Sequence, residues 1–332
     1  MERIEGKTNF MTMMQTQPIT GPAVWQANDF VNDESWVHHL NSAEIDGLEA
    51  MLAQLAADGR SFPHFTKADI SIGPIAAFLD ALAEELEHGR GFKLVRGLPI
   101  SRYSEAEINT LFYAMGLYMG EPVSQNPRGD LLGTVMHVGD ATKKETRVYE
   151  TNLYLPYHTD PSDVVGLMCV RKAKSGGMSS LVSAAAIYNE IIKRRPELLA
   201  LYYRPFCYAH LGAAKRTPIF SYNEGKLSCR YLRQYIELGH ENMGETLSQI
   251  EIEALDLFDQ IMMAPEMRID MLMEPGDIQF ANNYAVLHSR TAFEDHQAED
   301  QRRKKLRLWV KMPNARQLAP EFPGRNGFSD AA

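Results

Sequence analysis

The sequence is poor in features that would each mark a particular class of protein. It has only three cysteines, Cys169, Cys207 and Cys229, which are an odd number without close pairing. We therefore expect buried thiols in a reducing compartment, the cytoplasm, and no disulfide framework. No apolar run approaches the roughly 18 residues that a membrane span requires, and the N-terminus has no apolar signal core. The sequence predicts a cytoplasmic protein that does not cross a membrane.

An excess of positive charge is also missing. The formal net charge is -9, and the Lys and Arg residues form no long block. This charge argues against a general affinity for nucleic acid or for an anionic membrane. The chain contains no P-loop, no dinucleotide fingerprint and no internal repeat. We expect a small molecule as the partner, and a homo-oligomer stays open.

The length and the apolar content indicate one large domain. With 332 residues and 45% hydrophobic residues the chain can bury a sizeable core, and two domains are the alternative. We expect residues 1–20 to be a flexible tail and 319–332 a C-terminal tail. The domain between them, 21–318, would have a helical part at 21–90 and a β core at 91–315.

Hydrophobic periodicity predicts helices first and strands later. Helical patterns cover 42–59, where Ser42 can act as the cap, then 73–91 and 101–120, and one helical interruption follows at 184–204. Strands are predicted within 91–100, 163–173, 178–184, 228–232, 277–288 and 305–312. Strands joined by irregular segments favour an antiparallel sandwich or jelly roll. We expect a mainly β fold with helical layers, of the α+β class.

The stretch "LPYHTDPSD", residues 155–163, contains a candidate pair of metal ligands. In an extended segment His158 and Asp160 face the same side, so an imidazole and a carboxylate can meet at one point. A third ligand must come from elsewhere, and His288 stands at the end of the predicted strand 277–288. Two His and one carboxylate leave three positions of an octahedral Fe(II) open. Ligand type alone leaves other metals open, and each histidine alone could be an ordinary interior residue.

The last predicted strand carries an arginine on its inner face. Leu306 and Leu308 share one face, so Arg307 and Trp309 share the other. A buried guanidinium requires an anion, and its fork fits a carboxylate. The alternative is that this face lies in solvent. Residues 302–305, "RRKK", are expected to form a solvated turn.

Four motifs in this order resemble the iron(II)- and 2-oxoglutarate-dependent dioxygenases of the taurine dioxygenase and clavaminate synthase-like (TauD/TfdA) superfamily. They are "HTD" at 158–160, "SGGMSSLVS" at 175–183, "PGDIQFANNYAVLHSRTAFED" at 275–295 and "RRKKLRLWV" at 302–310. The resemblance extends from about residue 91 to residue 312. It implies a double-stranded β-helix, a jelly roll, that binds Fe(II), 2-oxoglutarate and O₂ and releases succinate and CO₂.

The same resemblance implies roles for individual residues. His158, Asp160 and His288 resemble the catalytic iron ligands. Arg307 resembles the arginine that pairs with the distal carboxylate of 2-oxoglutarate, with Arg302 or Arg303 as rivals because the preceding segment is longer than in short family members. Ser179 falls where the family has a Thr or Ser that contacts the cosubstrate.

The substrate is expected to be small and polar, an amino acid or another carboxylate, and hydroxylation is the default outcome. Desaturation, ring closure and epimerisation would use the same residues. Taurine is disfavoured, because Tyr154 stands where taurine-type enzymes have an amide. A zinc hydrolase with the same ligands and a non-catalytic metal-binding β-barrel are the alternatives. Candidate substrate contacts are Gln125, Asn126, Asn152, Tyr154, Arg204 and Arg230.

Overall fold

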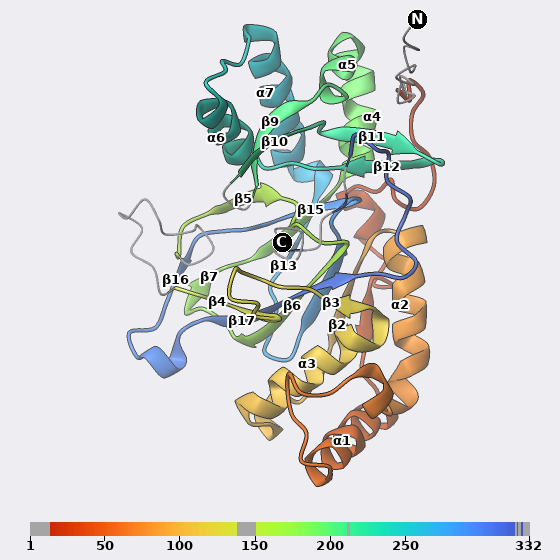
Figure 1. Cartoon of the computed structure of the whole chain (residues 1–332), viewed down its shortest axis with the longest axis vertical. Coiled ribbons are helices and arrows are strands. Elements are labelled where there is room, and N and C mark those ends of the chain that lie inside the picture. The colour runs from red at the N-terminus through yellow and green to blue at the C-terminus, as the bar shows by residue number, and fades with distance from the viewer. Residues whose placement is uncertain (1–13, 138–150, 211–212, 323, 325–326, 328–332) are drawn as a thin grey trace, which may run out of the picture.

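Two β-sheets lie between two groups of helices (Figure 1). The computed structural model describes residues 14–137, 151–210, 213–322, 324 and 327. The predicted fold, a jelly roll with helical layers, is confirmed. In the described residues, no helix is both long and apolar enough to cross a membrane.

The larger sheet has seven strands in the order β1-β2-β14-β6-β17-β3, with β4 paired to β17. All of these pairs are antiparallel except the parallel pair of β1 and β2. The central strand β6 therefore lies between two strands from the last part of the chain. The strands are β1 (Val37–His39), β2 (Phe92–Arg96), β3 (Glu121–Pro122), β4 (Leu132–Met136), β6 (Val164–Arg171), β14 (Ile278–Asn282) and β17 (Lys304–Lys311).

The smaller sheet has the order β13-β8-β15-β5 and carries both histidines of the predicted metal site. Its strands are β5 (Leu155–His158), β8 (Ser179–Ser183), β13 (Arg268–Met271) and β15 (Val286–Arg290). Three two-stranded sheets complete the fold. They pair β7 (Ser175–Gly176) with β16 (Phe293–Glu294), β9 (Phe206–His210) with β10 (Ala213–Thr217), and β11 (Phe220–Asn223) with β12 (Lys226–Cys229).

Helices cover the outer face of each main sheet (Figure 1). The larger sheet is covered by α1 (Ser42–Ala57), α2 (Ala76–His88) and α3 (Glu105–Met119), and the smaller one by α4 (Ala184–Arg194), α5 (Leu199–Tyr202), α6 (Arg233–Met243) and α7 (Gln249–Met263). Short 3₁₀ helices span Ala27–Phe30, Lys67–Asp69, Gly73–Ile75, Ile100–Arg102, Pro196–Leu198, Pro265–Met267 and Glu299–Gln301.

Three hydrophobic clusters fill the spaces between these layers. The first lies between the helices α1, α2 and α3 and the outer face of the larger sheet, and it includes Leu306 and Leu308. The second joins α4, α5 and α7 with the smaller sheet. The third lies between the two sheets and contains Val165, Leu181 and Trp309. The inner space that Trp309 faces is therefore bordered by both sheets.

Some local predictions need correction. The helical interruption at 184–204 is confirmed as α4 and α5, but α6 and α7 were missed, although Ser248 and Glu251 form a capping box at the start of α7. The predicted strand 277–288 is two strands, β14 and β15. Asn41 rather than Ser42 caps α1, because its side chain accepts a bond from the amide of Glu44.

The described parts of both expected tails contact the domain. The amide of Ile19 donates to Asn189 of α4 at 2.8 Å. Near the other end, Phe322 is fully buried and its ring packs beside Tyr284. Residues 1–13 of the first tail and 323, 325–326 and 328–332 of the second lie outside the described residues.

Candidate functional site

The three predicted metal ligands meet at one point between neighbouring strands. His158 ends β5 and lies directly opposite His288 in β15, while Asp160 follows β5 by two residues. The Nε2 atoms of His158 and His288 lie 3.8 and 3.6 Å from the two carboxylate oxygens of Asp160. Ligand atoms of all three residues lie within 4.8 Å of one another. This geometry suits a single metal ion held by two imidazoles and one carboxylate.

The charge states of these side chains also suit a metal. Nδ1 of His158 donates to the carbonyl of Pro156 at 2.8 Å, which leaves Nε2 free to coordinate. Burial and the neighbouring His288 lower the pKa of His158 to about 4, so its ring is neutral. Burial raises the pKa of Asp160, but Arg307 and His288 outweigh it and hold that pKa well below its usual range. A neutral imidazole beside an ionised carboxylate is ready to bind a cation.

Two neighbours fix the position of Asp160. Nε1 of Trp309 donates to the Asp160 carboxylate at 2.9 Å. The side chain of Asn283 accepts a bond from the amide of Asp160 and donates to the carbonyl of Ser162. Such outer partners orient metal ligands and tune their basicity. The donor set and its support fit Fe(II), whose open positions a two-His, one-carboxylate face leaves available.

Arg307 lies on the inner face of β17, as predicted. Its side chain is 91% buried, stacks over Trp309 with 4.2 Å from the guanidinium carbon to the ring centre, and bonds Gln125 at 2.8 Å. One terminal nitrogen lies 3.8 Å from Asp160. The solvent-exposed alternative for this face is therefore wrong.

The predicted solvated turn at 302–305 is wrong for two of its four residues. Arg303 is only 3% exposed and Lys305 only 4%. β17 begins at Lys304, and alternation along it carries Lys305 to the same inner face as Arg307. Nζ of Lys305 donates to Ser179 at 3.1 Å. The predicted cosubstrate residue Ser179 thus contacts Lys305, whereas Arg307 contacts Asp160 and Gln125.

Arg290, Arg303 and Lys305 with Ser179 form a cluster that we call the cationic pocket. Arg290 and Arg303 lie 4.7 and 5.0 Å from the ring centre of Phe293. Among the described residues, none of the three cations forms an ion pair within 4.0 Å. Two side-chain nitrogens of Arg290 and one of Arg303 are buried without a hydrogen-bond partner.

The cationic pocket is electrostatically strained. Burial, followed by the neighbouring charge of Arg303, lowers the pKa of Arg290 to about 9 and that of Lys305 to about 7. Burial also lowers the pKa of Arg303 to about 10. Clustered cations that burial has separated from water are stabilised by an anion. Sequence reasoning missed Arg290 and Lys305, although the alternation of β17 could have indicated Lys305.

Of the predicted substrate contacts, the structure brings Gln125 next to the metal site through its bond to Arg307. Asn126 bonds Asp130 within its own turn, Asn152 donates to the carbonyl of Phe293, and the hydroxyl of Tyr154 contacts Met263 of α7. Arg204 is exposed, and Arg230 bonds Thr217 and stacks over Phe322. These five side chains contact neighbours other than the three metal ligands, or solvent.

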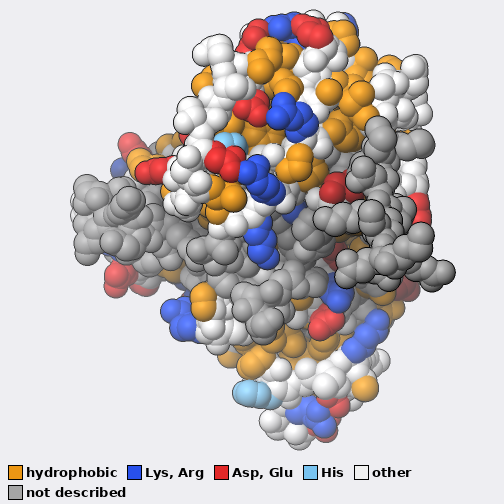
Figure 2. All heavy atoms as spheres, turned by 45° about the horizontal axis from the view of Figure 1, so that its top comes forward, with side chains coloured by type: hydrophobic (Ala, Val, Ile, Leu, Met, Phe, Trp, Pro, Cys, Tyr) orange, Lys and Arg blue, Asp and Glu red, His pale blue; other side chains and the backbone are white. Residues whose placement is uncertain are grey.

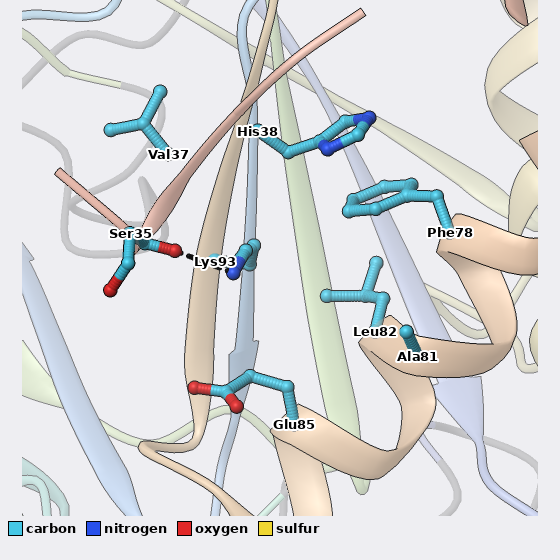
Figure 3. Close-up of a pocket in the computed structure, with 8 residues that line it drawn as sticks. All are labelled: Ser35, Val37, His38, Phe78, Ala81, Leu82, Glu85 and Lys93. Atoms are coloured by element: carbon cyan, nitrogen blue, oxygen red, sulfur yellow. Dashed lines mark hydrogen bonds between the residues drawn. The ribbon is translucent and has the colours of Figure 1, made fainter.

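A separate hollow lies on the other side of the larger sheet. Its volume is about 300 Å³, and it is lined by residues of β1, β2 and α2, including His38, Phe78 and Lys93 (Figure 3). Lys93 donates to the carbonyl of Ser35 at 2.7 Å. The residues that line this hollow belong neither to the metal site nor to the cationic pocket.

The molecular surface adds one observation about partners. Among the described residues, Figure 2 shows acidic and basic side chains interspersed on the face that it presents, with no extended patch of one sign. A footprint for nucleic acid would be a basic stripe or patch.

Comparison with known proteins identifies relatives of nearly the whole chain. Residues 58–309 match the family described as "Taurine catabolism dioxygenase TauD, TfdA family". FR-33289 synthase of Streptomyces rubellomurinus is 32% identical over 93% of this chain and 94% of its own. A taurine hydroxylase-like protein, SAT17, of Stachybotrys chartarum is 25% identical over 86% of this chain and 77% of its own.

Solved structures with the same fold include two oxygenases. Asparagine oxygenase in complex with Fe(II), 3-hydroxyasparagine and succinate has a TM-score of 0.64 at 16% identity, covering 83% of this chain and 93% of that one. The non-heme iron oxygenase OrfP in complex with Fe, succinate and (3S)-hydroxy-L-Arg has a TM-score of 0.62 at 14% identity, covering 83% and 94%.

Proposed function

Because the chain belongs to the TauD, TfdA family and is an iron(II)- and 2-oxoglutarate-dependent dioxygenase, we propose that it hydroxylates a small amino acid or another small carboxylate. The observation that carries this proposal is the buried guanidinium of Arg307, 3.8 Å from Asp160. A cation at that distance can bind an anionic group of a substrate beside the iron. The structural neighbours were solved with hydroxylated asparagine and arginine, which are substances of this class.

The iron would be held by His158, Asp160 and His288. When bound, iron supplies the activation of O₂ that couples decarboxylation of 2-oxoglutarate, to succinate and CO₂, with oxidation of the substrate. The chain supplies position. Trp309 fixes one oxygen of Asp160, and the bond from His158 to Pro156 fixes the ligating nitrogen. These contacts support a preformed site.

The distal carboxylate of 2-oxoglutarate would lie in the cationic pocket. This carboxylate is at the far end of the cosubstrate from the group that binds iron, so it suits a site one step removed from the metal ligands. Arg303 and Lys305 are buried cations without an acidic partner within 4.0 Å among the described residues, and Ser179 adds a hydroxyl. The prediction that Ser179 binds the cosubstrate is thereby kept, with Arg303 and Lys305 as its partners.

Arg307, which was predicted to share that carboxylate, is better placed for the substrate. One of its terminal nitrogens lies 3.8 Å from Asp160, and its side chain is oriented by Gln125 and by the ring of Trp309. A planar guanidinium held in this way can bind a carboxylate through two parallel bonds. We assign Arg307 to the carboxylate of the substrate and Gln125 to the orientation of Arg307.

Other observations concern the compartment, the partners and the domain organisation of the enzyme. All three cysteines are free and buried, which supports a reducing compartment, the cytoplasm. The formal net charge of -9, together with the interspersed charges on the face that Figure 2 presents, supports a small molecule rather than nucleic acid as the partner. One catalytic domain at 21–318 is our proposal for the organisation of the chain, and a homo-oligomer stays open.

Anaerobic addition of Fe(II) and 2-oxoglutarate tests the proposed ligand sets. We expect a weak visible charge-transfer band, which a zinc hydrolase would not give. Succinate release is then screened against amino acids, other carboxylates, sulfonates and neutral apolar compounds. Stimulation by the carboxylate-bearing compounds is expected, and stimulation by the apolar set alone would contradict the substrate class. A zinc hydrolase is disfavoured because a hydrolase does not use 2-oxoglutarate, so the cationic pocket would have no carboxylate to bind.

A further inference from the structure

A second group of metal-binding side chains lies in the part of the molecule formed by β9, β10 and α6. Cys207 belongs to β9, His240 to α6, and Glu245 follows α6 by two residues. Their ligand atoms lie within 4.8 Å of one another. We propose that Cys207, His240 and Glu245 bind a zinc ion, at a site built from other elements than the iron centre.

The fold brings these residues together by a close approach of helix and strand. At Gly239 an added Cβ would lie 2.6 Å from the backbone carbonyl carbon of Cys207, so only glycine lets α6 pack this tightly on β9. His240, the next residue, is thereby placed beside Cys207. α6 then ends at Met243, and its C-cap residue Gly244 has a φ of 66°. The amide of Glu245 bonds the carbonyl of His240 at 2.9 Å, which turns the Glu245 carboxylate back toward the other two residues.

Each of two ligands already has the outer partner that a metal site requires. Nδ1 of His240 donates to the carbonyl of Ile236 at 2.8 Å, which leaves Nε2 to coordinate. One oxygen of Glu245 pairs with Arg216, and the other lies 3.3 Å from the sulfur of Cys207. Metal-binding histidines and carboxylates are typically held by such hydrogen bonds. A thiol that merely donates to a surface carboxylate does not require a histidine oriented in this way.

The donor set selects zinc. A thiolate, an imidazole and a carboxylate are all zinc ligands, and three protein ligands with a water in the fourth position is a common arrangement. Cys207 is fully buried and His240 is 7% exposed, while Glu245 lies at the surface, which gives the ion a path of entry. Without metal, burial and the bond to Glu245 raise the pKa of Cys207, so binding of zinc should release a proton.

The site would fasten α6 to the β9–β10 hairpin. α6 begins at Arg233, two residues after Tyr231, whose carbonyl accepts a bond from the amide of Thr159 at 3.1 Å. Thr159 stands between two of the iron ligands, His158 and Asp160. Zinc at this position would therefore stabilise the wall behind the iron centre without taking part in its reaction.

Cobalt(II) tests this proposal, because a cobalt–thiolate bond gives a near-ultraviolet charge-transfer absorption that the sulfur-free iron centre cannot give. The full-length protein is freed of metal and titrated with Co(II). With Co(II) in excess of both sites we expect the intensity of one thiolate-bound Co(II) per chain, the loss of this absorption in Cys207→Ser, and its displacement by Zn²⁺. Cys229→Ser, a change at a buried cysteine of β12, is the matched control and should keep the absorption.

Two further variants make the result decisive. Glu245→Gln changes a surface residue and should weaken Zn²⁺ binding at least about tenfold with the fold unchanged in circular dichroism. His158→Ala removes an iron ligand and should leave the thiolate absorption intact. Absence of the absorption in the unaltered protein, its persistence in Cys207→Ser, or unchanged zinc affinity in Glu245→Gln would each overturn the site. The test does not depend on turnover, so the proposed reaction can fail independently.

Discussion

The iron centre and the cationic pocket share two strands, β15 and β17, but differ in how their charges are balanced. At the iron centre the negative charge of Asp160 faces the guanidinium of Arg307, 3.8 Å away, and the rings of His158 and His288 lie beside it. In the cationic pocket, Arg290, Arg303 and Lys305 have no acidic partner within 4.0 Å among the described residues. The protein alone nearly completes the first site, whereas we propose that a bound anion completes the second. A change at the first should damage the reaction, and a change at the second should also alter the stability of the free protein.

The largest effect is expected at the iron centre. His288→Ala removes one of three ligands and should lower turnover by more than about 100-fold, beyond what loss of an outer partner costs. The fold should survive, because this side chain lines the site and adds little to the hydrophobic clusters. Iron content and succinate release measure the effect. His296→Ala is the control, and a larger loss in the control than in His288→Ala would refute the ligand set.

Replacement of Arg303 should separate binding from stability. Arg303→Met should weaken the binding of 2-oxoglutarate by roughly 3–5 kcal/mol, because the distal carboxylate loses a buried partner. The ligand-free protein should become more stable, since an uncompensated buried charge is removed. Titration of the charge-transfer band and thermal melting measure the two effects.

Arg302→Met is the matched control for this prediction. The Arg302 side chain is 31% exposed, and we expect a change within about 0.5 kcal/mol. A strong loss of 2-oxoglutarate binding in Arg302→Met, with normal binding in Arg303→Met, would show that the distal carboxylate lies elsewhere.

Replacement of Arg307 should weaken the binding of the substrate more than the binding of the cosubstrate. Arg307→Ala should weaken substrate binding by about 2 kcal/mol or more, which would appear as a rise of the substrate KM. The affinity for 2-oxoglutarate should change less. Arg307→Lys keeps the charge without the two-pronged geometry and should be intermediate. Steady-state kinetics with each ligand varied separately will show it. A loss of affinity for 2-oxoglutarate alone would show instead that Arg307 binds the distal carboxylate of the cosubstrate.

Lys305 should make the stability of the ligand-free protein depend on pH. Burial lowers its pKa from the ordinary 10.5 to about 7. Between these two values the unfolded chain binds a proton at this residue that the folded chain does not. Stability should therefore rise with pH in this range, by up to about 1.4 kcal/mol per pH unit, and the slope should vanish below pH 7. Thermal melts over this pH range compare the unaltered protein with Lys305→Met, which lacks the titrating group. If stability depends on pH equally in both proteins, the role of Lys305 is contradicted.

The smallest effect is expected from an outer partner of the iron centre. Trp309→Phe removes the bond to Asp160 but keeps an aromatic ring under Arg307. The affinity for Fe(II) should fall about tenfold, the low end for such partners. An iron titration measures it, and an unchanged affinity would mean that the rest of the site orients Asp160.

The sequence predicts those features that depend on local alternation. His158 with Asp160, and Arg307 with Trp309, follow from strand period alone, and both pairs lie as expected. The place of His288 at the end of an extended run predicts it as the third ligand, and the structure brings it beside the other two residues. The start of the last strand differs from the prediction: the four basic residues at 302–305 are typical of a surface turn, but β17 already begins at Lys304.

Features that depend on long-range packing could not be predicted. Asn283 supports Asp160 from a turn more than a hundred residues away, and nothing local in the sequence indicates it. The missed helices α6 and α7 lie in a segment of mixed polarity. The surroundings of the candidate substrate residues could not be predicted for the same reason, because the hydroxyl of a loop residue such as Tyr154 contacts Met263 on a helix far along the chain.

The position of β6 has a consequence for how the protein is made. Both hydrogen-bonding edges of β6 are satisfied by β14 and β17, which leave the ribosome more than a hundred residues later. At 5–20 residues per second, β6 would wait on the order of ten seconds with its edges unpaired. Unpaired strand edges promote aggregation. We expect the yield of folded enzyme to depend strongly on growth temperature and on chaperones that hold unfinished chains.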